Sequence, residues 1–354
     1  MTEPHATLET KIAIVVTSIA RPNATLQALA RGARQRGFTF IVIGDEPSPM
    51  DFSLDGCDFV GLKQQRELGL KFAALCPTRH YARKNIGYLL AMRASAELLI
   101  ETDDDNAPDE TFWNQRTRLQ TVHAGTEAGW LNVYRYFTDT NIWPRGFPLN
   151  RINSSQSAFD ELAEHNVDAP IQQGLSDVDP DVDAIYRLTQ TAPVSFRRDR
   201  RVALKQNVWC PFNSQNTTWW RDAFPLLYLP AYCTFRMTDI WRSFVAQRIA
   251  WENNWSLLFH EPNSAQARNE HDLMRDFADE IPGYLRNAEI CEALGRLELR
   301  AGIEYLSDNL RVCYEELVRM GVVDVKELEL LGAWIDDVKA SFPKTHERAT
   351  TGSE

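Results

Sequence analysis

The sequence predicts an α/β protein with a parallel or mostly parallel sheet that helices cover on both faces. Apolar runs that read as strands alternate with segments of helical character up to about residue 110. These runs are continuously apolar, which is typical of strands buried on both faces. From 283 to about 341 the pattern becomes amphipathic helix, which predicts a C-terminal helical appendage.

The expected strands and helices follow one another along the N-terminal part of the chain. The apolar, strand-like runs lie at 11–19, 38–46, 57–62 and 97–105. A helix is expected at 20–37, which carries helix-start signals and closes with a glycine. Another is expected at 80–96, where Ile86, Leu89 and Leu90 recur at helical spacing. This alternation indicates strand–helix–strand units.

The middle of the chain carries mixed strand and loop signals, with a candidate strand at 132–137. The segment 238–254 returns to helix. Thr238 is its expected cap, and Asp239 lies in the first turn, where the helix dipole favours an acid.

Composition argues against several classes of protein. The chain has 354 residues and a formal net charge of −11, and its one dense basic run, at 197–201, contains an aspartate, so no nucleic-acid partner is expected. The six cysteines form no C-x-x-C pair, which argues against a zinc knuckle or a thioredoxin motif. No apolar stretch reaches the roughly 18–20 residues of a membrane span, and the N-terminus lacks a signal-peptide pattern. A soluble, cytoplasmic protein is therefore expected.

Three consecutive aspartates, Asp103, Asp104 and Asp105, end the fourth strand-like run. Like charges this close raise one another's pKa, and a divalent cation relieves the repulsion. On an extended chain Asp103 and Asp105 share one face, so both can address one Mg²⁺ or Mn²⁺ ion, which in turn would hold a diphosphate. The alternative is a solvated acidic turn that caps the next helix, and for a bare D-x-D tripeptide this alternative is the commoner case.

Other polar residues are expected near these acids. The first strand run ends in small polar residues and the second in acids, and ligands of open α/β sheets lie at the carboxyl ends of strands. Arg83, Lys84 and Asn85 begin a helix, where cations and free N–H groups can receive phosphate or a base. The alternative is that Arg83 and Lys84 face solvent.

Several sequence blocks resemble the STELLO-type glycosyltransferase family. They are "YARKNIGYLLA" (81–91), "IETDDDN" (100–106), "NIWPRGFPL" (141–149), "QQGLSDVDPDVDAIYRL" (172–188) and "FNSQNT" (212–217). That family is distantly akin to the reversibly glycosylated polypeptides, the UDP-arabinopyranose mutases, whose D-D-I-W element is similar to 238–242. The resemblance runs from about residue 10 to 285. It implies a GT-A fold, which is a Rossmann-like mixed sheet that binds a nucleotide-diphospho-sugar, with a D-x-D motif for Mn²⁺ or Mg²⁺.

With this resemblance the chain divides into four parts. They are a disordered N-terminus at 1–10, a GT-A-like domain at 11–282, the helical appendage at 283–341 and a disordered tail at 342–354. The appendage offers a surface for a homodimer.

The resemblance also implies roles for particular residues. The expected nucleotide-binding residues are Thr17, Arg21, Asp45, Arg83, Lys84, Asn85, Asp103 and Asp104. Asp103 and Asp105 would hold the metal, and His271 would complete its site, with a surface histidine as the alternative. Asp239 is the candidate catalytic base that deprotonates the acceptor hydroxyl, and the alternative is that it only favours the helix dipole.

Four further residues are candidates for contacts to the sugar or the acceptor. They are Trp143, Arg145, Asn213 and Gln215. A structural Trp-Pro corner is the alternative for Trp143 and Arg145. The acidic segment 177–183 begins like a calcium loop but has valine where the loop requires glycine, so a solvated acidic loop is expected there.

The function expected from these residues is transfer of a sugar from a nucleotide-diphosphate sugar to an acceptor hydroxyl, in surface glycan synthesis. A UDP-sugar is the favoured donor and a GDP-sugar the second choice, and the acceptor would be a glycan or a small molecule. Two alternatives stay open. One is a mutase that interconverts ring forms of a nucleotide sugar, and the other is a non-catalytic scaffold.

Overall fold

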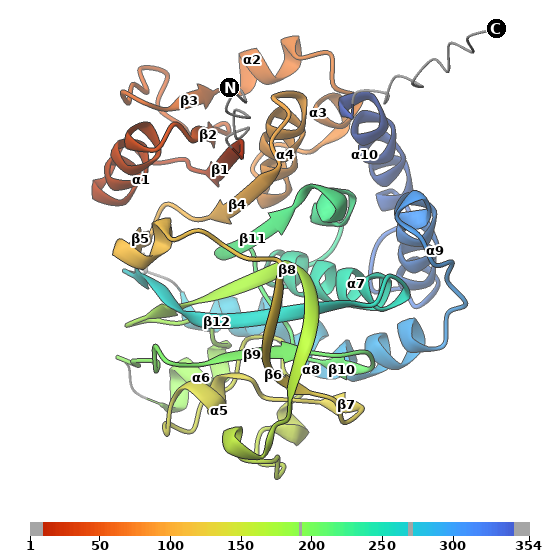
Figure 1. The fold of residues 1–354 in the computed structure, drawn as a ribbon. Helices are drawn as coiled ribbons and strands as arrows, with labels where there is room; N and C mark the ends of the chain where they lie inside the picture. The colour runs from red at the N-terminus through yellow and green to blue at the C-terminus, as the bar shows by residue number, and fades with distance from the viewer. Residues whose placement is uncertain (1–9, 191–192, 268–271, 343–354) are drawn as a thin grey trace, which may run out of the picture.

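The computed structural model describes residues 10–190, 193–267 and 272–342, and in these residues the chain is a mixed α/β protein (Figure 1). Ten of the described strands form one sheet in the order β3-β2-β1-β4-β11-β8-β6-β9-β12-β5, and β7 and β10 form a second, two-stranded sheet. The strands are β1 Ile12–Thr17, β2 Thr39–Ile43, β3 Asp58–Val60, β4 Leu98–Thr102, β5 Asn106–Pro108, β6 Leu119–Gly125, β7 Gly129–Trp130, β8 Glu164–Asp177, β9 Arg201–Leu204, β10 Val208–Trp209, β11 Asn216–Trp220 and β12 Trp255–Gln266.

The helices surround this sheet. The α-helices are α1 Ala24–Gln35, α2 Leu62–Glu67, α3 Lys71–Leu75, α4 Lys84–Arg93, α5 Tyr134–Phe137, α6 Ala184–Thr189, α7 Thr238–Glu252, α8 Leu273–Gly295, α9 Leu306–Arg319 and α10 Glu327–Ser341. Short 3₁₀ turns connect several elements. Those that bear on the site are η1 Tyr81–Arg83, η5 Arg221–Leu227 and η6 Phe235–Met237.

The sheet is parallel in its N-terminal part and mixed beyond it. Strands β1 to β4 pair in parallel, as their continuously apolar sequences predict. Strand β11 then runs antiparallel to both β4 and β8, and β9 runs antiparallel to β12. The expectation of a mostly parallel sheet therefore holds for the first four strands, whereas beyond them the parallel pairs β6–β9 and β8–β12 are mixed with antiparallel pairs.

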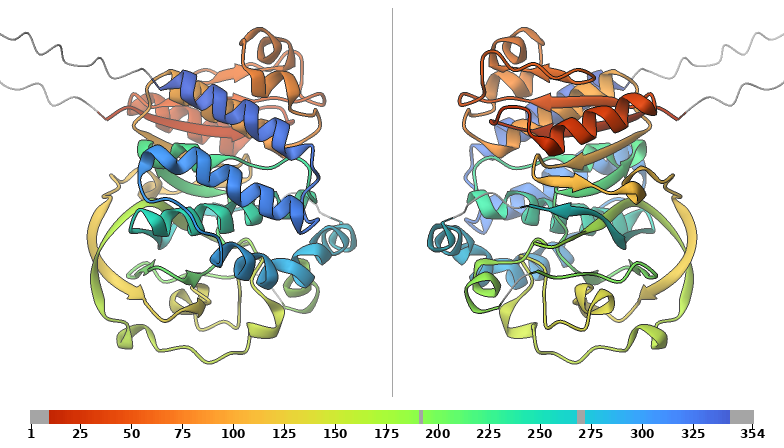
Figure 2. Two further views of the ribbon diagram at one scale, coloured as in Figure 1. Left: turned by 90° about the vertical axis from the view of Figure 1, so that its right-hand side faces the viewer. Right: turned by 90° about the vertical axis from the view of Figure 1, so that its left-hand side faces the viewer.

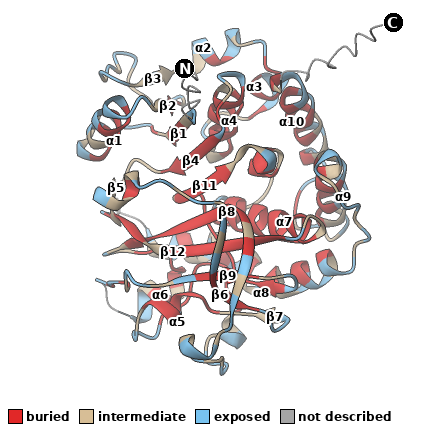
Figure 3. Cartoon of the chain, in the orientation of Figure 1, coloured by how far each residue is buried: buried red, intermediate tan, exposed pale blue. Residues whose placement is uncertain are grey.

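Different helices pack against the two faces of the N-terminal strands. Ile14 and Val16 of β1 pack with Leu26 and Leu29 of α1, whose N-cap Asn23 accepts a hydrogen bond from the backbone N–H of Leu26. The alternate residues of β1 point to the opposite face, into the cluster that includes α4. Figure 3 shows that the central strands and α7 are the most completely buried part of the molecule.

The C-terminal helices α8, α9 and α10 lie together along one side of the molecule (Figure 2). Their apolar residues belong to the same core cluster as β1, α4 and α7. Asp337 of α10 accepts hydrogen bonds from the backbone N–H groups of Lys71 and Phe72 at 3.2 and 2.7 Å, at the start of α3. The predicted boundary at 283 falls inside α8, so it does not separate two hydrophobic cores.

Several local expectations are corrected. The segment predicted as a strand at 132–137 forms α5 instead. Helix α7 begins at Thr238, but its N-cap is Met237, which makes no side-chain capping bond. No helix in the described ranges is long and apolar enough to span a membrane. The ends predicted to be disordered lie outside the described residues, except for Thr10 and Phe342.

Candidate functional site

The carboxyl ends of β1, β2 and β4 meet at one edge of the sheet. After β2, the backbone N–H of Asp45 donates to Ser48 Oγ at 2.9 Å, and Ser48 Oγ donates to the carbonyl of Ser18 at 2.9 Å. Ser18, which follows Thr17 at the end of β1, donates its hydroxyl to Asp104 Oδ2 at 2.5 Å. The structure thus brings Thr17, Asp45 and the aspartates together, as the strand ends predicted.

A buried cation, the ammonium group of Lys84, binds the carboxylate of Asp103. Its Oδ1 accepts hydrogen bonds from Tyr81 Oη and Lys84 Nζ, both at 2.8 Å. The Lys84 side chain is 0% exposed and that of Asp103 is 20% exposed. Both described contacts of this carboxylate therefore use Oδ1, and Oδ2 has no partner among the described residues.

The neighbouring acids have different surroundings. Burial raises the pKa of Asp104, although the hydrogen bond from Ser18 works against this. The Asp105 carboxylate accepts from Gln266 Nε2 and from Asn106 Nδ2, each at 3.2 Å. Asp103, Asp104 and Asp105, which we call the strand-end acids, are all only partly buried.

Lys84 links the strand-end acids to the start of β11. Its ammonium group donates to Tyr81 Oη at 2.8 Å, to Asp103 Oδ1 at 2.8 Å and to the carbonyl of Ser214 at 2.9 Å. An ammonium has three N–H donors, so these acceptors use all of them. Lys84 was predicted to contact the nucleotide or the diphosphate directly. In this conformation its three donors are all used inside the protein, and a direct contact to the nucleotide or the diphosphate stays a prediction.

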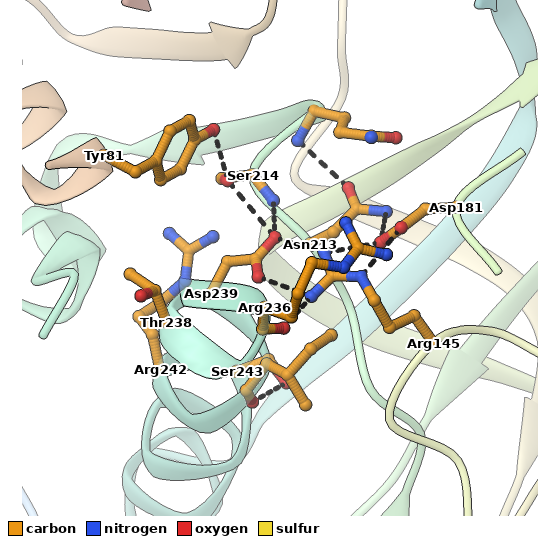
Figure 4. A network of polar contacts seen from close by, with 12 residues as sticks. Tyr81, Arg145, Asp181, Asn213, Ser214, Arg236, Thr238, Asp239, Arg242 and Ser243 are labelled. Atoms are coloured by element: carbon orange, nitrogen blue, oxygen red, sulfur yellow. Dashed lines mark hydrogen bonds and ion pairs between the residues drawn. The ribbon is translucent and has the colours of Figure 1, made fainter. Parts of the chain in front are cut away.

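Ser214 continues the chain of contacts to Asp239 (Figure 4). Its hydroxyl lies 2.7 Å from Tyr81 Oη and 3.3 Å from Asp239 Oδ2. Its backbone N–H donates to the same Asp239 oxygen at 3.2 Å. The predicted base is thus connected to the predicted metal ligand Asp103 through two hydroxyl groups.

Arg145 binds two buried carboxylates, and we call Arg145, Asp181 and Asp239 the Arg145 clamp. Arg145 donates to both oxygens of Asp181 at 2.8 Å and to both oxygens of Asp239 at 3.0 and 2.9 Å. Burial raises the pKa of Asp239, but the guanidinium groups of Arg145, Arg242 and Arg236 together lower it, to about 2. Burial likewise opposes the charge of Arg145, yet the carboxylates raise the pKa of its guanidinium well above the usual value. Arg145 and Asp239 are therefore both charged at neutral pH.

The acidic segment 177–183 is not a solvated loop. Asp181 and Asp183 are 3% and 0% exposed. Asp183 caps α6 by accepting from the backbone N–H of Tyr186 at 2.8 Å, and it accepts from Trp143 Nε1 at 2.6 Å. Burial raises the pKa of Asp183 to about 6. The expectation failed because the partners of these acids, Arg145 and Trp143, come from a distant part of the chain.

Several candidate ligand-binding residues have structural partners instead. Trp143 is 3% exposed and packs against Tyr186, so it offers no open face to a sugar. Arg83 is buried and donates to Gln65 Oε1 and the carbonyl of Cys76, each at 2.9 Å. Asn85 exchanges two hydrogen bonds with the backbone of Leu229. All three therefore have structural partners inside the fold, and a direct contact of any of them to a ligand stays a prediction.

Three further candidates around the site have contacts of different kinds. Arg21 forms an ion pair with Asp51 in which both side chains are 71% exposed. Asn213 donates to Asp181 Oδ2 at 3.0 Å and so supports the Arg145 clamp. Gln215 is partly exposed, and its backbone N–H donates to Asn213 Oδ1 at 3.0 Å.

The predicted metal site remains a prediction. Among the residues that the structure describes, no three His, Cys, Asp or Glu side chains are grouped as a metal site. His271, which was expected to complete the site, lies outside the described residues. Asp103 and Asp105 supply the hard carboxylate oxygens that Mg²⁺ and Mn²⁺ prefer, and Mg²⁺ sites commonly use one or two carboxylates together with substrate phosphates.

Residues that the sequence did not single out complete this arrangement. Tyr81, Ser214 and Ser18 supply the hydroxyl groups that connect the acids. Tyr81 and Ser214 lie inside the blocks 81–91 and 212–217, so their place in these motifs was the available signal. Ser18 directly follows the first strand, where a ligand site was already expected.

The fold and the site define a mixed α/β protein with acids and a buried lysine at the carboxyl ends of parallel strands. A family model of the STELLO glycosyltransferases matches residues 236–348. Two Arabidopsis thaliana proteins, probable glycosyltransferases STELLO1 and STELLO2, are each 30% identical to the chain, over 360 and 270 residues. The alignments cover 96% and 71% of this chain. The relationship to the STELLO glycosyltransferase family is thus confirmed.

The chain spans less than half the length of these relatives, at 46% of STELLO1 and 35% of STELLO2. Solved structures give a weaker likeness. Glucosyl-3-phosphoglycerate synthase of M. tuberculosis matches with a TM-score of 0.39 and 10% identity, covering 79% of this chain and 81% of that protein. A mycobacterial protein matches with a TM-score of 0.41 and 10% identity over 79% and 76%.

Proposed function

We propose that this chain is a glycosyltransferase of GT-A type, which moves a sugar from a nucleotide-diphosphate sugar to an acceptor hydroxyl. The observation that carries the proposal is the position of the strand-end acids, where the ends of β1, β2 and β4 meet. Ligands of open α/β sheets bind at this edge. The relationship to the STELLO glycosyltransferases supports sugar transfer as the reaction.

We propose that the reaction depends on Mn²⁺ or Mg²⁺, held by Asp103 and Asp105. The donor set fits such an ion, because both acids are partly exposed and Asp103 Oδ2 has no partner in the described part of the chain. When bound, a divalent ion would stabilise the negative charge that develops on the leaving diphosphate.

The chain's own residues would bind and orient the donor. Thr17 and Asp45 border the site at the ends of β1 and β2, beside the acids, and they suit contacts to the nucleoside. Tyr81 and Lys84 fix the carboxylate of Asp103 in one orientation. We propose a UDP-sugar as donor, with a GDP-sugar as second choice, and a glycan hydroxyl as acceptor.

The environment of Asp239 does not fit a general base. A base works best when its pKa lies near the working pH, and the guanidinium groups of Arg145, Arg242 and Arg236 lower the pKa of Asp239 to about 2. Both of its oxygens already accept hydrogen bonds from Arg145. We therefore propose that Asp239 positions Ser214 and does not itself take the proton of the acceptor.

The decisive experiment is calorimetry of the full chain with UDP, GDP and CMP, each with and without Mn²⁺. UDP with Mn²⁺ is expected to bind, and Asp105→Asn should weaken this binding about tenfold or more, while changing the free energy of unfolding by less than about 1 kcal/mol. Asp55→Asn is the control, because Asp55 is 85% exposed and pairs only with Arg34 among the described residues. If no nucleotide gives heat, or if the two variants behave alike, the proposal is wrong.

A further inference from the structure

Phe235 is the only aromatic side chain that the described part of the chain exposes to solvent. It is 52% exposed, whereas every other described Phe, Tyr and Trp is buried or partly buried. It is also the only exposed residue from 223 to 253, a stretch that includes α7. A single exposed apolar residue is ordinary on a protein surface, so the position of this one decides its meaning.

The ring of Phe235 lies beside the strand-end acids. Its centroid is 6.0 Å from that of Tyr81 and the two planes meet at 76°, so the rings pack edge to face. Tyr81 Oη donates to Asp103 Oδ1 at 2.8 Å and lies 2.7 Å from Ser214 Oγ (Figure 4). Only the ring of Tyr81 therefore separates Phe235 from an acid of the proposed donor site.

The turn that carries Phe235 is held on both sides. The backbone N–H of Met237 donates to the carbonyl of Thr234 at 2.9 Å, which closes η6 around Phe235. Arg236 donates to Glu280 Oε1 at 2.8 Å, and its own carbonyl accepts from the guanidinium of Arg145. A ring presented on such a fixed turn loses little conformational freedom when a ligand covers it.

The position of Phe235 favours the sugar end of the proposed site over its nucleoside end. Thr17 and Asp45, which suit contacts to the nucleoside, lie at the ends of β1 and β2. The sheet order β2-β1-β4-β11 places the start of β11 on the other side of β4, and Tyr81 Oη reaches Ser214 there. A ligand that stacks on Phe235 would thus lie beyond the acids from the nucleoside, on the side from which an acceptor can approach.

The charges next to Phe235 favour an uncharged ligand. Lys84 Nζ lies 5.0 Å from the centroid of the Tyr81 ring, and it pairs with Asp103. Arg236 follows Phe235 in the chain and pairs with Glu280. Both cations already bind a carboxylate, which disfavours a sugar acid. The face of an aromatic ring is electron-rich and attracts the weakly positive C–H bonds of an uncharged sugar ring.

We propose that Phe235 is the surface on which the acceptor stacks, and that the acceptor presents an uncharged pyranose ring to it. This inference rests on the proposed function and names the chemical class of the acceptor. It also explains why the fold leaves one aromatic side chain exposed at this place, on a turn that its neighbours hold.

The first test measures glycoside binding. The full chain, saturated with UDP and Mn²⁺, is titrated with the methyl glycosides of β-glucose, β-galactose, α-mannose and β-glucuronic acid, and binding is followed by saturation-transfer NMR. At least one uncharged glycoside is expected to bind more tightly than the glucuronide. Phe235→Ala should weaken this binding about tenfold, because the sugar loses its apolar contact. Absence of binding by all three uncharged glycosides, tightest binding by the glucuronide, or unchanged binding in the variant would overturn the inference.

The second test separates stacking from packing. Phe235→Trp keeps an aromatic face and should hold the glycoside affinity within about threefold. Phe235→Leu fills much of the same space beside Tyr81 but should lose affinity as Phe235→Ala does. A leucine variant that binds glycosides as well as the unmodified chain would overturn the inference. Leu119→Ala is the control, since it removes another exposed apolar side chain, 69% exposed on β6, and should leave the affinity unchanged.

Nucleotide binding distinguishes this inference from the proposed function. UDP and UDP-glucose, each with Mn²⁺, are titrated by calorimetry into the unmodified chain and into Phe235→Ala. Each nucleotide is expected to bind the two proteins equally, because the ring is assigned to the acceptor. A loss of affinity for UDP or for UDP-glucose in the variant would place the ring against the donor, which overturns the inference and leaves the proposed function standing. Absence of heat with every nucleotide would overturn both proposals.

Discussion

The strand-end acids and the Arg145 clamp are two groups of carboxylates with opposite designs. In the clamp, one guanidinium satisfies both oxygens of Asp181 and both oxygens of Asp239, and all three side chains are nearly inaccessible. At the strand end, Lys84 pairs with Asp103, and the three carboxylates remain partly exposed. Satisfied acids hold segments of the fold together, whereas an acid such as Asp103, whose Oδ2 has no partner among the described residues, is suited to bind a ligand. Three substitutions test this distinction, from the largest expected effect to the smallest.

Arg145→Met should show that the clamp stabilises the fold. The substitution leaves two buried carboxylates without their cation, and breaking a buried ion pair in this way costs about 3–5 kcal/mol. Urea unfolding measures the loss. Arg21→Met is the control, because it breaks an exposed pair with Asp51 and should change stability by less than about 1 kcal/mol. Equal losses in the two variants would remove the distinction between the two groups.

Glu327 is a buried carboxyl group whose described partners are neutral, in contrast to the carboxylates of the Arg145 clamp. It accepts from Tyr228 Oη and from the backbone N–H groups of Ala231 and Tyr232. Burial raises its pKa from 4.5 to about 7, in contrast to Asp239. The folded protein therefore holds this proton more tightly than the unfolded chain does, so its contribution to stability is lost as pH rises from 4.5 through about 7.

Glu327→Gln removes this titration. Between pH 5 and pH 8, the unmodified chain should lose about 2–3 kcal/mol relative to the variant, as measured by urea unfolding at each pH. Glu304→Gln replaces an exposed glutamate and should leave the pH profile unchanged. Parallel profiles for Glu327→Gln and the unmodified chain would show that burial does not control this group.

Trp143→Phe carries the smallest expected effect. The variant loses the hydrogen bond from Nε1 to Asp183 but keeps an aromatic ring against Tyr186, so it should lose about 1–2 kcal/mol of stability. Its affinity for a nucleotide sugar should stay the same, because the ring is buried. A large loss of affinity with unchanged stability would instead restore the original prediction that this tryptophan contacts the sugar.

The same comparison explains what the sequence could predict. The strand-end acids could be predicted because an apolar run is a pattern of neighbouring residues. The strand ends where that run ends, and the acids follow it directly. The clamp was missed because its bonds join residues 36 and 94 positions apart, which no local pattern records. The contact between Tyr81 and Ser214 spans 133 positions and was missed for the same reason. Likewise, periodicity identified the C-terminal helices, but it could not show which part of the core they cover.

The bond from Asp337 to the start of α3 has a consequence for how the protein is made. Phe72 lies on the early part of the chain, and its backbone N–H finds its acceptor 265 residues later. A ribosome must therefore add 265 residues after Phe72 before this segment is capped and covered. Until then the nascent N-terminal part carries an uncovered apolar surface, and a chain shortened at residue 283 would carry it permanently.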